Sequence, residues 1–182
     1  MKRLLHVCCA NCLSDAVEAL REDGAELVLY FANPNIHPLV EFRRRRKSVR
    51  LLAERLGVEL VEEPYGLRDF LDRVGNSMTR EQGRCGACYE LRMGASAAKA
   101  KDVGAESFTT TLLVSRAQDR ERVVAAGEAS AKEHGVRFES PEIRSLHGSD
   151  CARPRDLKLY KQSYCGCLFS EEERFRDSTR GE

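Results

Sequence analysis

Short strand-like runs occur at five places along the chain, and a longer, more polar stretch separates each from the next. The runs cover residues 4–7, 26–34, 58–65, 107–114 and 136–140. The first two are nearly continuous in apolar residues, as is typical of strands that a parallel sheet buries on both faces. We therefore predict five strands.

Between these runs, apolar residues return every three or four positions, which is the spacing of a helix that buries one face. The first such stripe runs from Leu13 to Leu20, and Gly24 follows it as a C-terminal cap. Ser115 and Gln118 stand at the spacing of a capping box and predict the start of a later helix. Helices are predicted over residues 13–20, 39–56, 67–74, 85–104 and 115–134.

The alternation of strands and helices predicts an α/β fold, a single Rossmann-like domain whose parallel sheet carries helices on both faces. With 182 residues the chain has the length of one domain rather than two. We place this catalytic domain at residues 1–169. Residues 170–182 are mostly charged, and we predict that they form a polar, disordered tail.

Composition limits the partners and the compartment of the protein. The 30 basic and 29 acidic residues leave a net charge of +1, so a polyanion must be bound by a local patch. No apolar stretch reaches the ~18–20 residues that span a bilayer, and charges soon after the first apolar run argue against a signal peptide. We therefore expect a cytoplasmic protein without a membrane partner. Cysteines stay reduced there, so eight of them indicate metal binding or redox chemistry.

Seven of these cysteines fall into three dense groups, which is the strongest chemical signal in the chain. The groups are CCANC (Cys8, Cys9, Cys12), RCGAC (Cys85, Cys88) and YCGC (Cys165, Cys167). A C-x-x-C spacing, present in the first two groups, brings two thiolates to one side of the chain. Three dense cysteine groups in one domain indicate a polynuclear or paired metal site. Iron–sulfur clusters take about four thiolates, a number that CC and CGAC supply together. The eighth, Cys151, is expected to be a buried thiol that acts as a small apolar residue.

The YCGC group differs from the other two. Cys165 and Cys167 are too close in sequence for an unstrained disulfide, and a strained bridge is easily reduced. The pair is therefore either a redox-active dithiol or a set of ligands for a second metal, with Cys12 as its neighbour. The CCANC group directly follows the first strand, at the sheet edge where folds of this kind bind ligands.

The best candidate patch for nucleic acid is the basic stretch from Arg43 to Arg50. Arg44 is a candidate substrate contact within it. Arg45 falls on the apolar stripe of the predicted helix, a position that a purely solvated charge does not need. It either extends past the edge of the core or reaches phosphates or a charged cluster near the site.

Three further side chains have two interpretations each. His6 lies inside the first strand and reads as a core histidine. His37 follows the second strand at the same sheet edge and is a candidate substrate contact. Tyr164, beside the YCGC cysteines, either donates a proton to substrate or packs in the interior.

Taken together, these motifs resemble those of the cobalamin-independent epoxyqueuosine reductases, the QueH family. The matching stretches are LHVCCANC, YFANPNIHPLVEFRRR, RCGACYELR, SFTTTLLVS and YKQSYCGCLFS, and they spread over nearly the whole chain up to Ser170. The resemblance implies an oxidoreductase that removes the epoxide oxygen of epoxyqueuosine at the wobble position of a tRNA anticodon, giving queuosine. Arg116 departs from the family pattern, which commonly has proline there.

The resemblance also implies cofactors, roles and partners. A [4Fe–4S] cluster would be held by Cys8, Cys9, Cys85 and Cys88. Cys165 and Cys167 would be the redox-active dithiol, able to close a disulfide bond, and the position of Cys12 is similar to one that helps to hold an additional iron. The implied partners are the anticodon stem-loop of queuosine-accepting tRNAs and an electron donor such as a ferredoxin or flavodoxin.

Three other functions compete with this one. An ATP-using tRNA-modifying enzyme needs a glycine-rich phosphate loop after the first strand, and CCANCLSD contains no glycine. A non-catalytic iron or redox sensor would bind a cluster yet turn over no modified tRNA. A zinc protein would be colourless.

Overall fold

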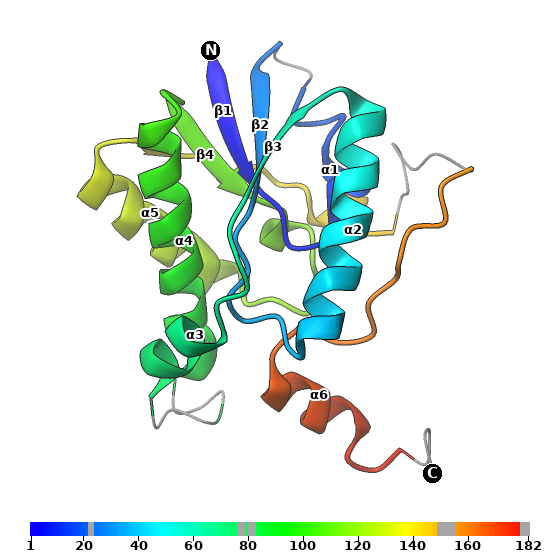
Figure 1. The fold of residues 1–182 in the computed structure, drawn as a ribbon. Coiled ribbons are helices and arrows are strands. Elements are labelled where there is room, and N and C mark those ends of the chain that lie inside the picture. The colour runs from blue at the N-terminus through cyan, green and yellow to red at the C-terminus, as the bar shows by residue number, and fades with distance from the viewer. Residues whose placement is uncertain (22–23, 76–78, 80–82, 149–155, 179–182) are drawn as a thin grey trace.

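The computed structural model describes residues 1–21, 24–75, 79, 83–148 and 156–178. At its centre is a parallel sheet of five strands in the order β3-β2-β1-β4-β5 (Figure 1). β1 pairs in parallel with β2 on one side and with β4 on the other, so β1 is the central strand. The predicted α/β fold with a parallel sheet is confirmed. The strands are β1 (Lys2–His6), β2 (Glu26–Phe31), β3 (Glu59–Glu62), β4 (Ser107–Thr110) and β5 (Arg137–Phe138).

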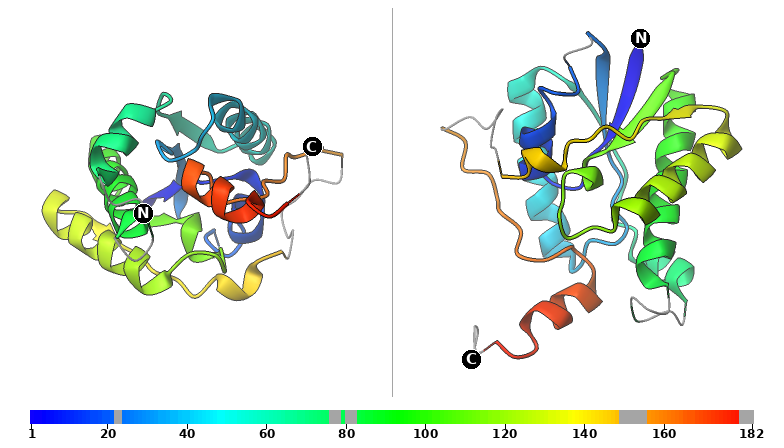
Figure 2. Two further views of the ribbon diagram at one scale, coloured as in Figure 1. Left: turned by 90° about the horizontal axis from the view of Figure 1, so that it is seen from below. Right: turned by 180° about the vertical axis from the view of Figure 1, so that it is seen from behind.

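Helices cover both faces of this sheet, as predicted. α1 (Ala10–Ala16) and α2 (Leu39–Leu56) lie on one face, whereas α4 (Arg84–Asp102) and α5 (Arg120–His134) pack together on the other (Figures 1 and 2). α3 (Leu67–Val74) packs near the start of α4. The strand order therefore reverses between β1 and β4. Open α/β sheets bind their ligands at this reversal, beyond the carboxyl ends of the strands.

Several boundaries follow the sequence pattern closely. α2 and α3 occupy the predicted residues 39–56 and 67–74. The predicted strand 107–114, in contrast, ends at Thr110. The Thr110 hydroxyl accepts a hydrogen bond from the main-chain N–H of Leu112 and starts a short 3-10 turn, which the apolar pattern of this segment conceals.

The predicted helix over 115–134 begins later than expected. Ser115 does not cap it. Asp119 is the N-cap of α5, because its carboxylate accepts a hydrogen bond of 3.2 Å from the main-chain N–H of Arg122. The segment between β4 and α5 is therefore a loop, which leaves its side chains free to line a site at the sheet edge.

The prediction of a disordered tail over 170–182 is wrong for its first residues, because α6 (Leu168–Phe175) continues past the expected domain end. Two contacts hold this helix to the domain. Arg84 pairs with Glu173 at 2.6 Å, and its guanidinium lies 4.9 Å from the ring centre of Phe169. Because buried Arg84 holds α6 through an ion pair and a cation–π contact, this helix does not fray as a purely charged segment would.

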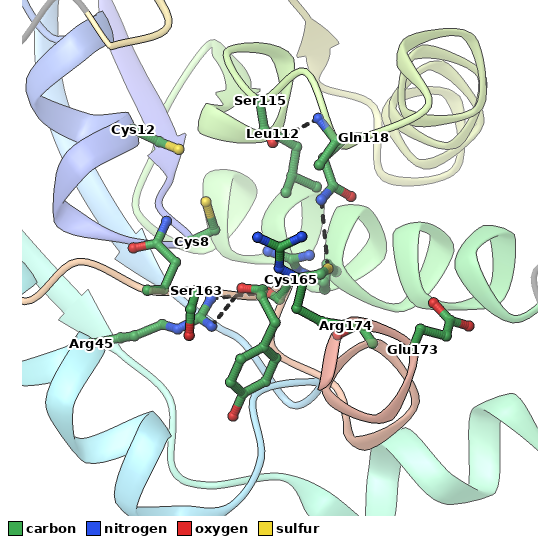
Figure 3. A pocket seen from close by; sticks show the side chains of 15 residues that line it. Cys8, Cys12, Arg45, Leu112, Ser115, Gln118, Ser163, Cys165, Glu173 and Arg174 are labelled. Atoms are coloured by element: carbon green, nitrogen blue, oxygen red, sulfur yellow. Dashed lines mark hydrogen bonds between the residues drawn. The ribbon is translucent and has the colours of Figure 1, made fainter. Parts of the chain in front are cut away.

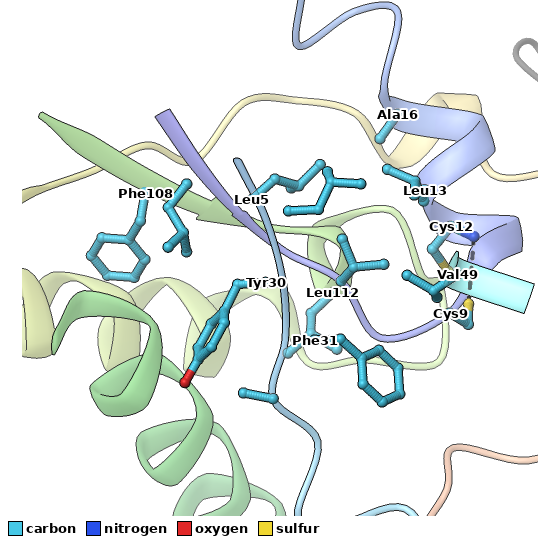
Figure 4. Close-up of a cluster of buried hydrophobic side chains, with 14 of the residues drawn as sticks. Leu5, Cys9, Cys12, Leu13, Ala16, Tyr30, Phe31, Val49, Phe108 and Leu112 are labelled. Atoms are coloured by element: carbon cyan, nitrogen blue, oxygen red, sulfur yellow. Dashed lines mark hydrogen bonds between the residues drawn. The ribbon is translucent and has the colours of Figure 1, made fainter. Parts of the chain in front are cut away.

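The hydrophobic core lies on both sides of the central strands. Leu4 and Leu5 of β1 are fully buried, as are Phe31 at the end of β2 and Phe108 of β4. Figure 4 shows that Cys9 and Cys12 border this same core, so the cysteine group after β1 is built into the interior. Among the described residues, no helix combines the length and the apolar character needed to cross a membrane.

Candidate active site

A cavity of about 450 Å³ lies beyond the carboxyl ends of β1 and β4 (Figure 3). The segment after β1 contributes Cys8 and Cys12 to its wall, and the loop after β4 contributes Leu112 and Gln118. Cys165 comes from the chain just before α6. Three segments that are far apart in the sequence thus meet at the strand-order reversal. The charged side chains that line the cavity are Arg45, Arg92, Glu173 and Arg174.

Cys8, Cys9 and Cys12 form one compact sulfur group. Their sulfur atoms all lie within 4.8 Å of one another, a spacing at which they could share a metal ion. Cys9 is the N-cap of α1 in an extended conformation, and its sulfur accepts a hydrogen bond from the main-chain N–H of Cys12 (Figure 4). The irregular end of β1 therefore lets two adjacent cysteines converge, which a regular strand would prevent.

The pKa values of the three thiols in this group shift in different directions. Hydrogen bonds from Cys12 and then Cys9 lower the pKa of Cys8 well below its usual range, although burial opposes them. The bond with Cys12 also lowers the pKa of Cys9, but the bond with Cys8 and burial outweigh it and raise that pKa to about 12. Hydrogen bonding to Cys8 and Cys9 raises the pKa of Cys12 well above its usual range. Hydrogen bonds from the two neighbouring thiols therefore favour the thiolate form of Cys8 over that of Cys9 or Cys12.

Side-chain donors from distant segments also reach the sulfurs. The Thr111 hydroxyl lies 3.3 Å from the Cys8 sulfur, and the Gln162 amide nitrogen lies 2.8 Å from the Cys9 sulfur. Asn11 in turn donates to the Gln162 oxygen at 3.1 Å. Sequence reasoning missed Gln162 because a lone glutamine in a loop carries no pattern that links it to a cysteine.

In the YCGC segment, the side-chain amide of Gln118 donates a hydrogen bond to a cysteine sulfur. Its amide nitrogen lies 3.5 Å from the Cys165 sulfur, as Figure 3 shows, while the Tyr89 hydroxyl donates to its oxygen at 2.9 Å. Burial raises the pKa of Cys165, so this sulfur is a protonated thiol within the cavity wall. The sequence pattern predicted that Gln118 helps to cap a helix, but Asp119 caps α5 and Gln118 contacts Cys165 instead.

The remaining described cysteines lie around this thiol. Cys88 and Cys167 are buried in one small cluster of apolar side chains between α3 and α6. Burial raises the pKa of Cys88 to about 12, and the positive charge of Arg92 opposes that shift. Cys85 is partly buried at the start of α4 and does not line the cavity. All seven described cysteines are free thiols, and Cys151 lies outside the described residues.

The structure groups Cys12 with Cys8 and Cys9. Cys165 and Cys12 face the same cavity from different walls. The expected assignment of Cys8, Cys9, Cys85 and Cys88 to one cluster remains a prediction.

Arg45 does not extend past the core edge but is buried and lines the cavity, and a contact with phosphates stays a prediction. It is 2% exposed and pairs with Glu41 at 2.7 Å. Its two terminal nitrogens donate to the main-chain carbonyl oxygens of Tyr164 and Cys165, each at 2.9 Å (Figure 3). Arg45 thus fastens the YCGC segment to α2. Arg44 beside it is exposed, and its guanidinium lies 5.8 Å from the ring centre of Tyr160.

The other predicted side chains have structural partners. His6 is fully buried and lies 2.8 Å from the Thr110 hydroxyl, as expected of a core histidine. His37 is buried against Tyr65 and Phe70 and does not line the cavity, so the structure does not support a direct substrate contact.

Tyr164 lines the cavity wall, but its hydroxyl donates to the carbonyl oxygen of His37. Burial raises its pKa, which keeps the phenol protonated and engaged in that bond. The main-chain N–H of His37 donates a hydrogen bond of 2.7 Å to the main-chain carbonyl oxygen of Gly166. The loop around His37 therefore positions the YCGC segment, and of the two interpretations of Tyr164 the structure favours packing.

Comparison with known proteins gives a consistent result. A family model described as epoxyqueuosine reductase QueH matches residues 3–173. The epoxyqueuosine reductase QueH of Dehalococcoides mccartyi is 38% identical over 96% of this chain and 94% of its own length. That of Haemophilus influenzae is 33% identical over 98% of the chain and 74% of its own length. The protein of the same name from Helicobacter pylori is 39% identical over 92% of the chain, but over only 48% of its own length.

Proposed function

The chain belongs to the epoxyqueuosine reductase QueH family, and from this premise we propose that it reduces epoxyqueuosine in tRNA to queuosine. The observation that carries the proposal is the cavity at the strand-order reversal, which Cys8 and Cys12 after β1 and Cys165 before α6 line together. An epoxide that becomes an alkene takes up two electrons and two protons, and its oxygen leaves as water. The reducing groups must therefore lie beside the substrate.

The donor set fits an iron–sulfur cofactor. Clusters of this kind require several cysteine thiolates, and the described part of the chain offers seven free cysteines, of which Cys8, Cys12 and Cys165 line the cavity. Hydrogen bonds lower the pKa of Cys8, which favours its thiolate form, and the sulfurs of Cys9 and Cys12 converge with it. We propose that Cys8, Cys9, Cys85 and Cys88 hold a [4Fe–4S] cluster, and that Cys12 helps to hold an additional iron. When bound, such a group supplies single electrons and a Lewis acid for oxygen.

The Cys165/Cys167 pair can supply the two electrons and two protons that the reduction of the epoxide consumes. Two thiols that join as a disulfide release two electrons and two protons, which balances the conversion of an epoxide into an alkene and water. Cys165 meets the requirement for a proton donor because burial keeps it protonated in the cavity wall. The Gln118 amide orients its sulfur at 3.5 Å. An external donor, of the ferredoxin or flavodoxin class, would then restore the thiols.

The cavity also suits a modified base taken out of an RNA loop. Its volume of about 450 Å³ lies in the range of small-molecule sites. Single-stranded loops present bases that can be turned outward into a pocket. Arg174 lines the cavity and Arg44 is exposed on α2, so both are available to the phosphates of an anticodon loop.

The decisive experiment combines composition with turnover. We expect anaerobically purified protein to contain iron and sulfide and to convert epoxyqueuosine-containing tRNA when reduced. Cys165→Ala should abolish turnover, whereas Cys151→Ala, at a cysteine outside the three groups, should not. Unchanged turnover by Cys165→Ala would remove that pair from the mechanism. A colourless zinc protein, or a cluster protein without turnover, would overturn the proposed function itself.

A further inference from the structure

Arg92 is a buried cation that has no acidic partner among the described residues. Its side chain is 1% exposed and lines the cavity. One terminal nitrogen donates to the side-chain oxygen of Asn33 at 2.8 Å, while its Nε atom is buried without a hydrogen-bond partner in the described structure. A guanidinium is charged at any physiological pH, so this charge cannot be avoided by deprotonation.

The other buried arginines of the described chain show how unusual this is. Each of them pairs with a carboxylate: Arg3 with Glu139 at 2.6 Å, Arg45 with Glu41 at 2.7 Å, and Arg84 with Glu173 at 2.6 Å. Removing a charge from water without a counter-charge is costly, and buried charges in proteins are accordingly paired. The counter-charge of Arg92 must therefore come from the cavity that it lines.

Sulfur surrounds Arg92 from all three cysteine segments. Cys8 after β1 and Cys165 before α6 line the same cavity as Arg92, and Cys88 lies about one helical turn before Arg92 on α4. The guanidinium thus shares this cavity with sulfurs of the CCANC and YCGC groups, and its fixed charge attracts the anionic form of each.

We propose that Arg92 is the built-in counter-charge of the cysteine-bound iron centre and that it sets the reduction potential of that centre. This inference rests on the proposed function. A centre that gains an electron becomes more negative by one charge, and a fixed cation stabilises the reduced form more than the oxidised form. Arg92 therefore makes the centre easier to reduce by a protein electron donor, and it acts as a positioning residue rather than on the substrate.

The test compares midpoint potentials of the anaerobic, iron-loaded protein, measured by redox titration with absorbance and electron paramagnetic resonance. Arg92→Gln removes the charge, and we expect its midpoint potential to be more negative than that of the wild type. Arg92→Lys keeps the charge and should largely restore the wild-type value. Arg122→Gln removes a charge that is 53% exposed on α5 and should leave the potential unchanged. Equal potentials for the wild type and an iron-loaded Arg92→Gln variant would overturn the inference.

A second variant guards against a failure of Arg92→Gln to fold. Asn33→Asp places a carboxylate where Asn33 now accepts from Arg92, and so neutralises the cation in place. We expect the same negative shift, and an unshifted potential would reject the counter-charge. The two proposals fail differently: wild-type protein without iron overturns the proposed function and this inference with it. If the wild type is active and iron-loaded but neither Arg92→Gln nor Asn33→Asp shifts the midpoint potential, only this inference is overturned.

Discussion

Arg45 on α2 donates a hydrogen bond of 2.9 Å to the main-chain oxygen of Cys165, 120 positions further along the chain. Its second bond, to Tyr164, and its buried pair with Glu41 complete a clamp on the YCGC segment. Because both bonds go to main-chain carbonyl oxygens, the clamp fixes the backbone of this segment, and so the position of the Cys165 sulfur, without contacting that sulfur. The position of the thiol in the cavity therefore depends on a helix that supplies no cysteine.

Replacing this clamp should damage both stability and turnover. Arg45→Met leaves Glu41 buried and unpaired, and we expect a loss of about 3–5 kcal/mol in the free energy of unfolding. Arg45→Lys keeps the charge but cannot make both carbonyl bonds, so turnover should fall ~10–100-fold with a smaller loss of stability. Urea unfolding and single-turnover assays measure the two effects. Arg43→Met, at an exposed neighbour, is the matched control, and equal effects at both positions would contradict the clamp.

The stability of the protein should depend on pH through His6. Burial lowers the pKa of His6 from 6.5 to about 3, so the folded protein holds it neutral while the unfolded chain binds a proton below pH 6.5. The unfolded state is therefore favoured as pH falls through this window, by about 1.4 kcal/mol per pH unit. The loss ends near pH 3, where the folded state binds the proton too.

Urea unfolding at pH 7, 6 and 5 tests this dependence. His6→Gln should be less stable at pH 7 but lose less stability between pH 7 and 5 than the wild type does. His147→Gln, at an exposed histidine, should show the wild-type slope. A His6→Gln variant with that same slope would show that His6 is not the titrating group.

The hydrogen bond from Gln118 should control the reactivity of Cys165. The amide lowers the pKa of Cys165 against the effect of burial, so Gln118→Leu should raise that pKa and slow alkylation by iodoacetamide at pH 8, by ~2–10-fold. Tyr89→Phe frees the Gln118 oxygen and should give a smaller effect in the same direction. Site-resolved mass spectrometry reads out each cysteine. Faster alkylation of Cys165 in Gln118→Leu would contradict this role.

Gly127 in α5 should tolerate no side chain. A Cβ atom there would lie 2.5 Å from the ring of Phe138, which itself packs against Phe108. We expect Gly127→Ala to destabilise the protein by ~1–3 kcal/mol, because overpacking outweighs the gain in helix propensity. Gly94→Ala in α4 meets open space and should be neutral or stabilise by up to ~1 kcal/mol. Thermal unfolding of both variants decides whether the packing at Gly127 is as close as described.

The alternation of apolar runs and helical stripes was enough to determine the parallel α/β fold and the extent of α2 and α3. Local patterns suffice for such features because burial and helix period act between near neighbours. They did not place the end of β4 or the start of α5, where the side chains of Thr110 and Asp119 bond to nearby main-chain N–H groups. They also missed α6, because the contacts that hold it come from Arg84 on another helix.

The sequence alone predicted that cysteines form the functional site and that this site lies at the end of the first strand. Only the folded chain decided which sulfurs share a group and which side chains serve them. Gln162 reaches Cys9 from 153 positions away, and Arg92 lines one cavity with Cys8 and Cys165. Hydrogen bonds and charge attraction depend on distance in space, and a linear pattern carries no information about distances that long-range packing creates.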